Sequence, residues 1–503
     1  MVTDCQNYIN GRWVDAGGGE TFPDRNPSNW DEVIAAAPRS GAEDADAAVA
    51  AAREAFEGWR ALSRIKRAEY MDAVVQLAKG DTDELAAAMA LECGKPINEC
   101  RADVVEGIHM LQYCFGRARM ADGYALASEI AEKDAFVLRK PKGVAVAITP
   151  WNFPFAIPTW LIGPSLTEGN TVVFKPSEET PIVGQRLVEY FDHVGLPPGV
   201  LNLVQGFGEE VGEPLVQHPD VNVVLFTGSY AVGSHIRQEV AKFSNKMAAC
   251  EMGGKNAMIV SESARMEIAV PAALISVFKT TGQRCVSAER LLVHESRIDE
   301  FTERFVAGAR GLRVGDPLSD DTFMGPLINR DQIEKTAYYN KLARDEGGDV
   351  LLDGAAPEVA GFPNGNWAGA FAYRMDYRPD ARVLCEEVFG PHAAIVPFHD
   401  VEDAAHIYNA TEYGFSLAVI SEDYRELRRL QDVCDFGVGY VNLPTIGAEV
   451  HLPFGGLKRS GTGLPSASAL IDVVTHRVAW TVNHAPDIKM AQGMSSAIEG
   501  SPA

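Results

Sequence analysis

One cysteine and one glutamate carry the clearest chemical signal in this sequence. Cys285 directly follows a Gly-Gln-Arg run at 282–284, and Glu251 precedes a Met-Gly-Gly bend at 252–254. A thiol can attack a carbonyl carbon, and a carboxylate can activate the water that hydrolyses the resulting thioester. Because a lone cysteine is more often a small buried apolar residue, such a reaction also needs an oxyanion site and a redox cofactor.

Asn152 is the candidate for the oxyanion site. It lies between two prolines in the run 149–154, directly after an apolar stretch that we expect to form a buried strand. Its amide N–H₂ and the backbone N–H of Cys285 can together hold an oxygen that becomes negative when a thiolate attacks a carbonyl. The alternative is that Asn152 only shapes a turn.

Three segments are candidates for binding a dinucleotide. The strict GxGxxG fingerprint is absent, and the run 206–212 has one residue too many, so a surface loop is its alternative interpretation. The Phe-Thr-Gly-Ser run at 226–229 follows a buried strand and opens a helix, whose free N–H groups can receive a pyrophosphate. Lys175 and Glu178 also follow a strand and can bond the adenosine ribose. Glu178 would repel a 2′-phosphate, so NAD is favoured and NADP stays possible.

The elements that position these residues alternate between strands and helices. Short β-branched runs at 143–148, 170–174 and 221–226 predict strands buried on both faces. A helix is expected from Pro181 to about His193 between two of them, which indicates a parallel, doubly wound sheet. A second α/β stretch follows over 254–450. We also expect a helix over 42–62, an extended segment over 126–139 and a strand over 473–482.

Composition limits the class of protein. The 503 residues predict two or three domains, and a net charge of −24 argues against nucleic acid and anionic membrane as partners. The eight cysteines are scattered without a CxxC pair, so we expect reduced thiols, with no disulfide framework and no metal site. Neither a signal peptide nor an apolar run of roughly 20 residues is visible, which predicts a cytoplasmic location.

Taken together, the chain resembles the NAD(P)-dependent aldehyde dehydrogenase superfamily over essentially its whole length. The resemblance implies an α/β fold with a doubly wound Rossmann-like cofactor domain (1–120 and 141–252), an α/β catalytic domain (253–462) and a small β oligomerisation domain (121–140 and 463–503), assembled as homodimers or homotetramers. The matching segments, in family order, are 150–154, 175–178, 226–229, 251–255, 282–285, 387–391 and 453–456.

The resemblance also implies residue roles. Cys285 is the nucleophile, Glu251 the general base and Asn152 the oxyanion donor in oxidation of a small-molecule aldehyde to an acid. Glu387 would hold the nicotinamide ribose and Phe389 would pack beside the nicotinamide. The remaining expected cofactor contacts are Ile148, Thr149, Trp151, Lys175, Glu178, Gly208, Gly212, Phe226, Gly228, Ser229, Met252 and Gly253.

Two positions depart from the usual family pattern. Leu161 stands after Trp160, where many members carry lysine, and His476 stands where a glutamate is common. We hypothesise that the surroundings of Glu251 are altered and that His476 takes part in proton exit. The alternative is a neutral repacking.

The substrate is indicated by Arg284, which precedes the nucleophile at a position that lines the substrate tunnel in relatives. A guanidinium there can bind a carboxylate, which predicts a carboxylated semialdehyde. The run 442–449 resembles members acting on α-ketoglutaric or α-aminoadipic semialdehyde. Arg284 can instead form a structural ion pair or lower the pKa of Cys285. Phe153, Ile157 and Trp160 are expected to wall the tunnel, or else to be plain core.

Other functions remain open at this point. A broad-specificity enzyme for neutral aldehydes would need no carboxylate site. A coenzyme-A-acylating enzyme is disfavoured by Glu251, because acyl transfer to a thiol needs no water-activating base. A non-catalytic structural or binding protein is disfavoured by the presence of Cys285, Glu251 and Asn152, and a papain-type hydrolase lacks a fitting Cys-His arrangement.

Overall fold

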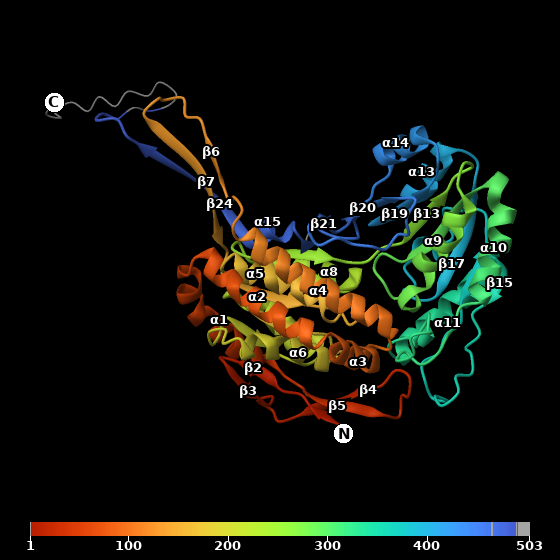
Figure 1. Ribbon diagram of the computed structural model, residues 1–503, viewed down its shortest axis with the longest axis horizontal. Coiled ribbons are helices and arrows are strands. Elements are labelled where there is room, and N and C mark those ends of the chain that lie inside the picture. The colour runs from red at the N-terminus through yellow and green to blue at the C-terminus, as the bar shows by residue number, and fades with distance from the viewer. Residues whose placement is uncertain (1, 464–465, 489, 491–503) are drawn as a thin grey trace.

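The fold is built on two seven-stranded sheets and a projecting arm (Figure 1). The computed structural model describes residues 2–463, 466–488 and 490. The predicted α/β class is confirmed. The domain boundaries stay a prediction, and part of the expected oligomerisation domain (464–465, 489 and 491–503) lies outside the described residues.

The first sheet has the strand order β12-β11-β8-β9-β10-β2-β3. Its centre is parallel, and an antiparallel hairpin closes one edge. The central strands are almost fully buried, as their continuous apolar runs predict. The strands are β12 (Met247–Glu251), β11 (Val221–Thr227), β8 (Val144–Ile148), β9 (Thr171–Lys175), β10 (Leu201–Leu203), β2 (Asn7–Ile9) and β3 (Arg12–Val14).

Helices cover both faces of this sheet and bury its apolar side chains. A large core joins the sheet to α2, α3, α4 and α5, which lie together in Figure 1. A smaller core packs α1, α7 and α8 on the sheet. The helices are α1 (Ala42–Ala61), α2 (Arg64–Gly80), α3 (Thr82–Cys93), α4 (Ile97–Arg117), α5 (Ala156–Thr167), α6 (Pro181–His193), α7 (Glu213–Gln217) and α8 (Tyr230–Val240), with a π-turn at Gly208–Gly212.

The second sheet has the order β15-β16-β17-β14-β13-β19-β20 and is parallel except for its first pair. Its two faces carry separate apolar cores. The strands are β15 (Asp349–Asp353), β16 (Phe371–Arg374), β17 (His392–Phe398), β14 (Ala288–His294), β13 (Asn256–Val260), β19 (Ser416–Ile420) and β20 (Val438–Val441). The helices are α9 (Met266–Phe278), α10 (Ile298–Arg310), α11 (Arg330–Asp345), α12 (Arg382–Cys385), α13 (Val401–Asn409) and α14 (Tyr424–Val433).

The arm is an antiparallel sheet that projects from the first lobe (Figure 1). Strand β7 (Lys133–Pro141) pairs along its whole length with β24 (Thr475–Asn483), and β6 (Tyr124–Leu126) adds a short edge. Large apolar side chains on the arm are about half exposed, among them Leu126 and Trp480.

The remaining elements are short. They are β1 (Thr3–Asp4), β4 (Thr21–Arg25), β5 (Val33–Pro38), β18 (Tyr413–Gly414), β21 (Pro453–Phe454), β22 (Leu457–Lys458), β23 (Ser466–Ala467), α15 (Leu470–Val474) and two 3₁₀ turns at Lys279–Gly282 and Glu295–Arg297. Among the described residues, no helix is both long and apolar enough to span a bilayer. The cytoplasmic location stays a prediction.

Candidate active site

A cavity of about 200 Å³ brings the predicted chemical groups together. Its lining comes from the carboxyl ends of β8 and β11, from the bend after β12 and from the loops around the second sheet. Open α/β sheets bind ligands at this edge. The lining residues are Pro150, Trp151, Asn152, Thr227, Gly228, Ser229, Gly253, Cys285, Gln332, Lys335, Glu387 and Phe389.

Cys285 reaches this cavity through a left-handed run of backbone. We call residues 279–285 the nucleophile loop. Thr280 and Thr281 have φ of 53° and 56°, and Gly282 has φ of 73°. A Cβ at Gly282 would lie 2.1 Å from the carbonyl oxygen of Gly390, so only glycine fits there. Left-handed threonines are unfavourable, and other contacts must therefore hold this loop.

Glu251 ends β12 and is almost fully buried beside Cys285. The backbone N–H of Gly253 donates a 2.8 Å hydrogen bond to its Oε1. Burial raises the pKa of Glu251 to about 8, while the bonds to Gly253 and to the Cys285 thiol oppose that rise. The carboxyl group is thus poised to change its protonation state near neutral pH, as a general base should.

The surroundings of the Cys285 thiol favour its protonated form. Its pKa lies well above the usual value because of burial and because Glu251 and Glu387 are acidic neighbours, while Arg284 opposes the rise. A base that accepts the proton would favour the thiolate. Glu251 is the carboxyl group that acts most strongly on this thiol and can do so.

Asn152 is fixed over the same cavity by two hydrogen bonds. Its side-chain Nδ2 donates to the backbone carbonyl oxygen of Gln283 at 2.9 Å. Its backbone carbonyl oxygen accepts from Nζ of Lys95 at 2.8 Å. An amide N–H₂ has two hydrogens. One is used by Gln283, and the other remains for an oxygen on a carbon bonded to Cys285.

A second cavity, of about 440 Å³, lies between the π-turn, α7 and α8. Its lining includes Ile148, Gly208, Gly212, Val216 and Ile236, an apolar set that suits a flat aromatic base. Predicted cofactor contacts therefore line both cavities.

The turn between the two cavities is shaped for an anion. Ser229 caps α8 by accepting from the N–H of Val232, and a Cβ at Gly228 would lie 2.5 Å from the Phe226 ring. The open N-terminus of α8 offers N–H groups to a pyrophosphate. At the end of β9, Lys175 lies 3.4 Å from the Glu178 carboxylate. This combination of apolar slot, helix terminus and polar pair fits a dinucleotide.

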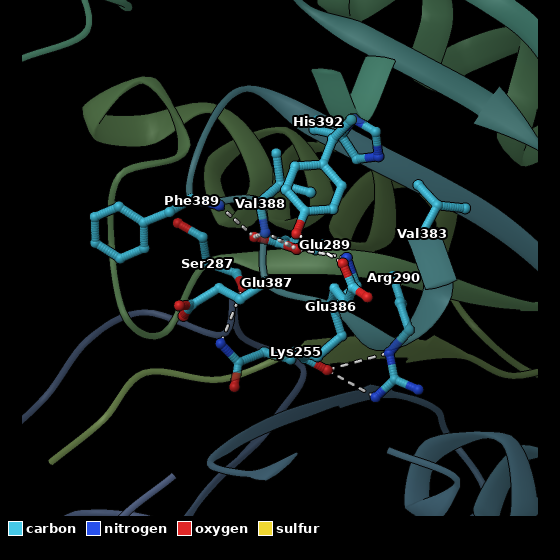
Figure 2. Close-up of polar contacts among 12 residues, drawn as sticks. Lys255, Ser287, Glu289, Arg290, Val383, Glu386, Glu387, Val388, Phe389 and His392 are labelled. Atoms are coloured by element: carbon cyan, nitrogen blue, oxygen red, sulfur yellow. Dashed lines mark hydrogen bonds and ion pairs between the residues drawn. The ribbon is translucent and has the colours of Figure 1, made fainter. Parts of the chain in front are cut away.

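A buried glutamate holds the turn that carries Glu387 and Phe389 (Figure 2). Glu289 accepts from the backbone N–H groups of Val388 and Phe389 at 2.8–3.0 Å and forms a 2.6 Å ion pair with Lys255. These bonds stabilise Phe389, whose φ of 62° is unusual for a bulky residue. The Phe389 ring turns away from Glu289 and meets the Trp151 ring edge-on at 5.7 Å.

Comparison with known proteins is consistent with this geometry. A model described as "Aldehyde dehydrogenase family" matches residues 13–478. The chain belongs to the aldehyde dehydrogenase family. It is 34% identical to the alpha-ketoglutaric semialdehyde dehydrogenase of Bacillus subtilis, in an alignment that covers 91% of this chain and 93% of that protein. It is 35% identical to the alpha-ketoglutarate semialdehyde dehydrogenase of Haloferax volcanii, in an alignment that covers 92% of this chain and 95% of that protein.

The fold also matches a solved member of the family. Betaine aldehyde dehydrogenase of Staphylococcus aureus, in complex with NAD⁺, superposes with a TM-score of 0.91 at 30% identity, covering 96% of this chain and 95% of that one. The predictions of family and of an enzyme class are thereby confirmed.

Some of the residues predicted to contact the cofactor do not line either cavity of this chain. Phe226 and Met252 are buried in the core beneath α8, and a Cβ at Gly233 would collide with Met252. Thr149 is buried at the end of β8. These residues pack beneath the turn at Gly228–Ser229, and their direct contact with a cofactor stays a prediction.

Sequence reasoning missed two polar residues of the first cavity. Gln332 and Lys335 lie on α11, and Gln332 donates to the carbonyl oxygens of Val388 and Phe389. Lys335 lowers the pKa of Glu387, although burial is the larger effect and raises that pKa to about 7. The only sequence signal was a helix start at Asn329, which does not indicate what the helix faces.

The residues expected around the substrate have mixed surroundings. Arg284 forms a 2.5 Å ion pair with Glu99, which is the structural role given above as the alternative to binding a substrate carboxylate. The centre of the Phe153 ring lies 4.9 Å from the Arg284 guanidinium carbon and 3.9 Å from the Lys95 ammonium nitrogen. Trp160 is buried against the Phe454 ring, whereas Ile157 is half-buried and packs on the core together with Cys285.

The structure contradicts the proposed role of His476. Its side chain is exposed on the arm strand, where partial burial and the charge of Lys142 lower its pKa. Lys142, which acts on His476, contacts Met247 at the start of β12. Glu251 is the last residue of that strand and lies about 13 Å from Met247 at the rise of an extended chain, so His476 is at the wrong end of β12 to serve Glu251. Leu161 is 2% exposed in the apolar core, as the repacking alternative requires.

Proposed function

We propose that this chain oxidises an aldehyde to a carboxylic acid with NAD as acceptor, with Cys285 as nucleophile, Asn152 as oxyanion donor and Glu251 as general base. The observation that carries the proposal is that Cys285 and Asn152 line one cavity, with the buried Glu251 carboxyl group close enough to Cys285 for each to shift the other's pKa. The cavity also contains the Gly228–Ser229 turn and Glu387, where a dinucleotide would enter.

The first half of the reaction uses Cys285 and Asn152. Glu251 accepts the thiol proton, and the sulfur attacks the aldehyde carbon to give a thiohemiacetal. The free N–H of Asn152 and the backbone N–H of Cys285 stabilise the oxygen as its charge develops. When bound, NAD supplies the acceptor for the hydride that leaves this carbon. A thioester then remains on Cys285.

The second half uses Glu251. Glu251 first releases to solvent the proton that it took from Cys285. The regenerated carboxylate then takes a proton from water, which attacks the thioester carbon and releases the acid, and the departing sulfur receives that proton as the free thiol. Acyl transfer to coenzyme A needs no such base, so a buried carboxyl group beside the sulfur favours hydrolysis. NAD would be held by Lys175 and Glu178 at the adenosine end, by the α8 terminus at Ser229, and by Glu387 and Phe389 at the nicotinamide end.

The substrate we propose is a carboxylated semialdehyde of the α-ketoglutaric type. The named activity of the Bacillus and Haloferax relatives supports it. Arg284 donates from Nε to Thr280 and from Nη2 to Glu99, which leaves Nη1 without a partner among the described residues. A carboxylate would therefore gain one bond from Arg284, in place of the bidentate pair that a free guanidinium offers.

A cationic aldehyde is the second candidate, and a specific observation favours it. Glu106 lies one turn beyond Asp103 on α4, and burial raises its pKa to about 8. Burial, Cys285, Glu106 and Glu449 together raise the pKa of Tyr440, so both glutamates belong to the surroundings of that tyrosine. Glu106 is mostly neutral at pH 7, and a bound cation such as betaine aldehyde, the substrate named for the Staphylococcus relative, would favour its ionised form and be held by it.

A panel of aldehydes separates these functions. The purified chain is assayed for NADH and NADPH formation with carboxylated, aminated and neutral aldehydes, without coenzyme A, and the acid product is identified. We expect the highest kcat/KM with a carboxylated aldehyde and NAD. No NADH with any aldehyde, or activity equal to that of Cys285→Ser, would overturn the proposed function.

We also propose a homodimer or homotetramer. Tyr124, Leu126, Leu138 and Trp480 place exposed apolar surface on the arm, where a second copy can cover it. Light scattering after size exclusion should give a multiple of the 54.4 kDa chain mass. A monomer at assay concentration would contradict this.

A further inference from the structure

The start of helix α4 carries buried charges that the proposed mechanism does not use. Lys95, Glu99 and Asp103 are 2%, 6% and 0% exposed, although charged residues are almost never fully buried unless paired. All of them contact one of the two segments that meet at the reacting sulfur. These segments are the nucleophile loop and residues 151–156, which we call the oxyanion segment.

Lys95 and Asp103 hold the oxyanion segment at two points. Lys95 Nζ donates to the carbonyl oxygen of Asn152 at 2.8 Å and lies 3.9 Å from the centre of the Phe153 ring. It also pairs with Asp103 at 2.6 Å. The second oxygen of Asp103 accepts from the backbone N–H of Ala156 at 2.7 Å. The ion pair thus fixes both the residue that holds the oxyanion and the first residue of α5.

Glu99 holds the nucleophile loop. Its carboxylate accepts from the backbone N–H of Thr280 at 3.1 Å and from the Thr280 hydroxyl at 2.5 Å, and pairs with Arg284 at 2.5 Å. Thr280 begins the left-handed run, which is unfavourable without compensating contacts. A carboxylate that binds the first residue of this run and Arg284, two residues beyond its last, supplies such contacts.

The two segments are also joined to each other. Asn152 donates to the carbonyl oxygen of Gln283, and the Phe153 ring contacts the cationic groups of both Lys95 and Arg284. We propose that Lys95 and Glu99 are positioning residues, and that through them the start of α4 sets the separation of Asn152 from the Cys285 sulfur. The inference rests on the proposed function and adds the origin of the geometry on which it depends.

Lys95→Met tests the oxyanion half. Displacement of catalytic groups by about 1 Å can cost on the order of a hundredfold in rate. We therefore expect kcat per active site to fall at least ~10-fold, while the Kd for NAD is unchanged because the cofactor cavities do not include Lys95. Active sites are counted by stoichiometric alkylation of Cys285, so that loss of folded protein does not lower the value. The matched control is Arg67→Met, which removes another buried cation bonded to backbone carbonyls, those of Leu62 and Thr167.

A double variant keeps the test valid if Lys95→Met folds poorly. Lys95→Met leaves Asp103 buried without its cation, which is strongly destabilising. Lys95→Met/Asp103→Asn removes both charges and keeps an oxygen for the N–H of Ala156. We expect the double variant to regain stability without regaining kcat. If kcat per active site returns with stability, or never falls, the positioning role of Lys95 is refuted.

Glu99→Gln tests the nucleophile half with a readout that needs no turnover. The charged and titratable groups that act on the Cys285 thiol are Glu251, Glu387, Arg284 and Tyr440. Without the Glu99 charge, Arg284 is no longer neutralised and should favour the thiolate. In a plot of the rate of Cys285 alkylation by iodoacetamide against pH, the rise should therefore be shifted to lower pH than in wild type.

An alkylation profile identical to that of wild type, with unchanged kcat, would refute the role of Glu99. Because alkylation does not depend on the substrate, it also separates the two proposals. Absence of aldehyde oxidation in wild type would overturn the proposed function, while a shifted profile in Glu99→Gln would still support the positioning inference.

Discussion

The backbone N–H of Gly253 and the Oε1 atom of Glu251 are joined by a 2.8 Å hydrogen bond. Gly253 has φ of 68°, and a Cβ there would lie 2.3 Å from the Glu387 carboxylate. The bend after β12 therefore needs glycine in order to turn its N–H back onto the base. This bond favours the carboxylate, while burial favours the neutral acid, and burial prevails.

The first prediction concerns the pH dependence of thioester hydrolysis. With a Glu251 pKa of about 8, the carboxylate that activates water is the minor form at pH 7 and the major form above pH 8. The hydrolysis rate should rise with pH and reach a plateau above about 8. Glu251→Gln should slow hydrolysis by about 10²–10⁴-fold.

Rapid-mixing measurements of NADH formation check this prediction. Because Glu251 also takes the proton of Cys285, Glu251→Gln should slow NADH formation at neutral pH. A burst of about one NADH per active site, followed by slow turnover, should appear only at a pH high enough for the thiol to lose its proton to solvent. Glu251→Asp is the control, because it keeps the carboxyl group. A wild-type rate that falls as pH rises to 8 would contradict Glu251 as the base.

The second prediction concerns Asn152. Asn152→Ala removes the amide donor, and loss of one such donor typically lowers kcat by about 10²–10³-fold. Asn152→Asp keeps the shape but places a negative charge beside the developing oxyanion, so it should be at least as inactive. Steady-state kinetics on sites counted by Cys285 alkylation measure this. Activity within a few-fold of wild type for Asn152→Ala would leave Asn152 with only its turn-shaping role.

The third prediction concerns the stability of the Glu99–Arg284 pair. Arg284→Met leaves the buried Glu99 carboxylate with Lys279 Nζ, at 3.7 Å, as its remaining cation, so the substitution should cost at most the roughly 3–5 kcal/mol of a broken buried pair. Arg284→Met/Glu99→Gln removes both charges and should recover most of that loss. Urea unfolding of the wild type, both single variants and the double variant gives the coupling energy. Additive effects of the two substitutions would show that the pair is not coupled.

The chemical groups of the site were predictable because each follows a strong local signal. Asn152 and Ser229 lie just beyond apolar strands, and Cys285 and Glu251 adjoin glycines that must turn the chain. The expected strands and the helix from Pro181 to His193 were found for the same reason, since buried parallel strands have continuous apolar sequences.

The supporting charges were not predictable in this way. Lys95, Glu99 and Asp103 belong to a helical region whose charged residues resemble an ordinary solvated face. They become buried only because α5 and the nucleophile loop pack over the start of α4, and these segments lie 53 to 185 residues away along the chain. His476 failed as a prediction because the family pattern indicates a position in the sequence and not the distance to Glu251.

The last prediction concerns a buried pair of carboxyl groups outside the active site. Asp24 and Glu92 are 3% and 0% exposed, and each carboxyl group shifts the pKa of the other. Glu92 also accepts from the backbone N–H groups of Ile182 and Val183 at the start of α6. Burial raises the pKa of Asp24 to about 8 and raises that of Glu92 well above its usual value. At neutral pH the pair therefore retains at least one proton that the unfolded chain has lost.

The consequence is a loss of stability as pH rises from about 4 to about 8, because over this interval the folded state binds more protons than the unfolded state. Below this interval both states are protonated, and above it the part of the loss that comes from Asp24 is complete. Asp24→Asn stays uncharged at every pH, so it should lack the part of the loss that comes from Asp24. Each pKa unit is worth about 1.4 kcal/mol, so Asp24→Asn should exceed wild type by at least that amount at about pH 9. Urea unfolding at about pH 5 and about pH 9 measures this, and Asp24→Asn less stable than wild type at the higher pH would show that the Asp24 carboxylate is stabilised by an ionic partner instead.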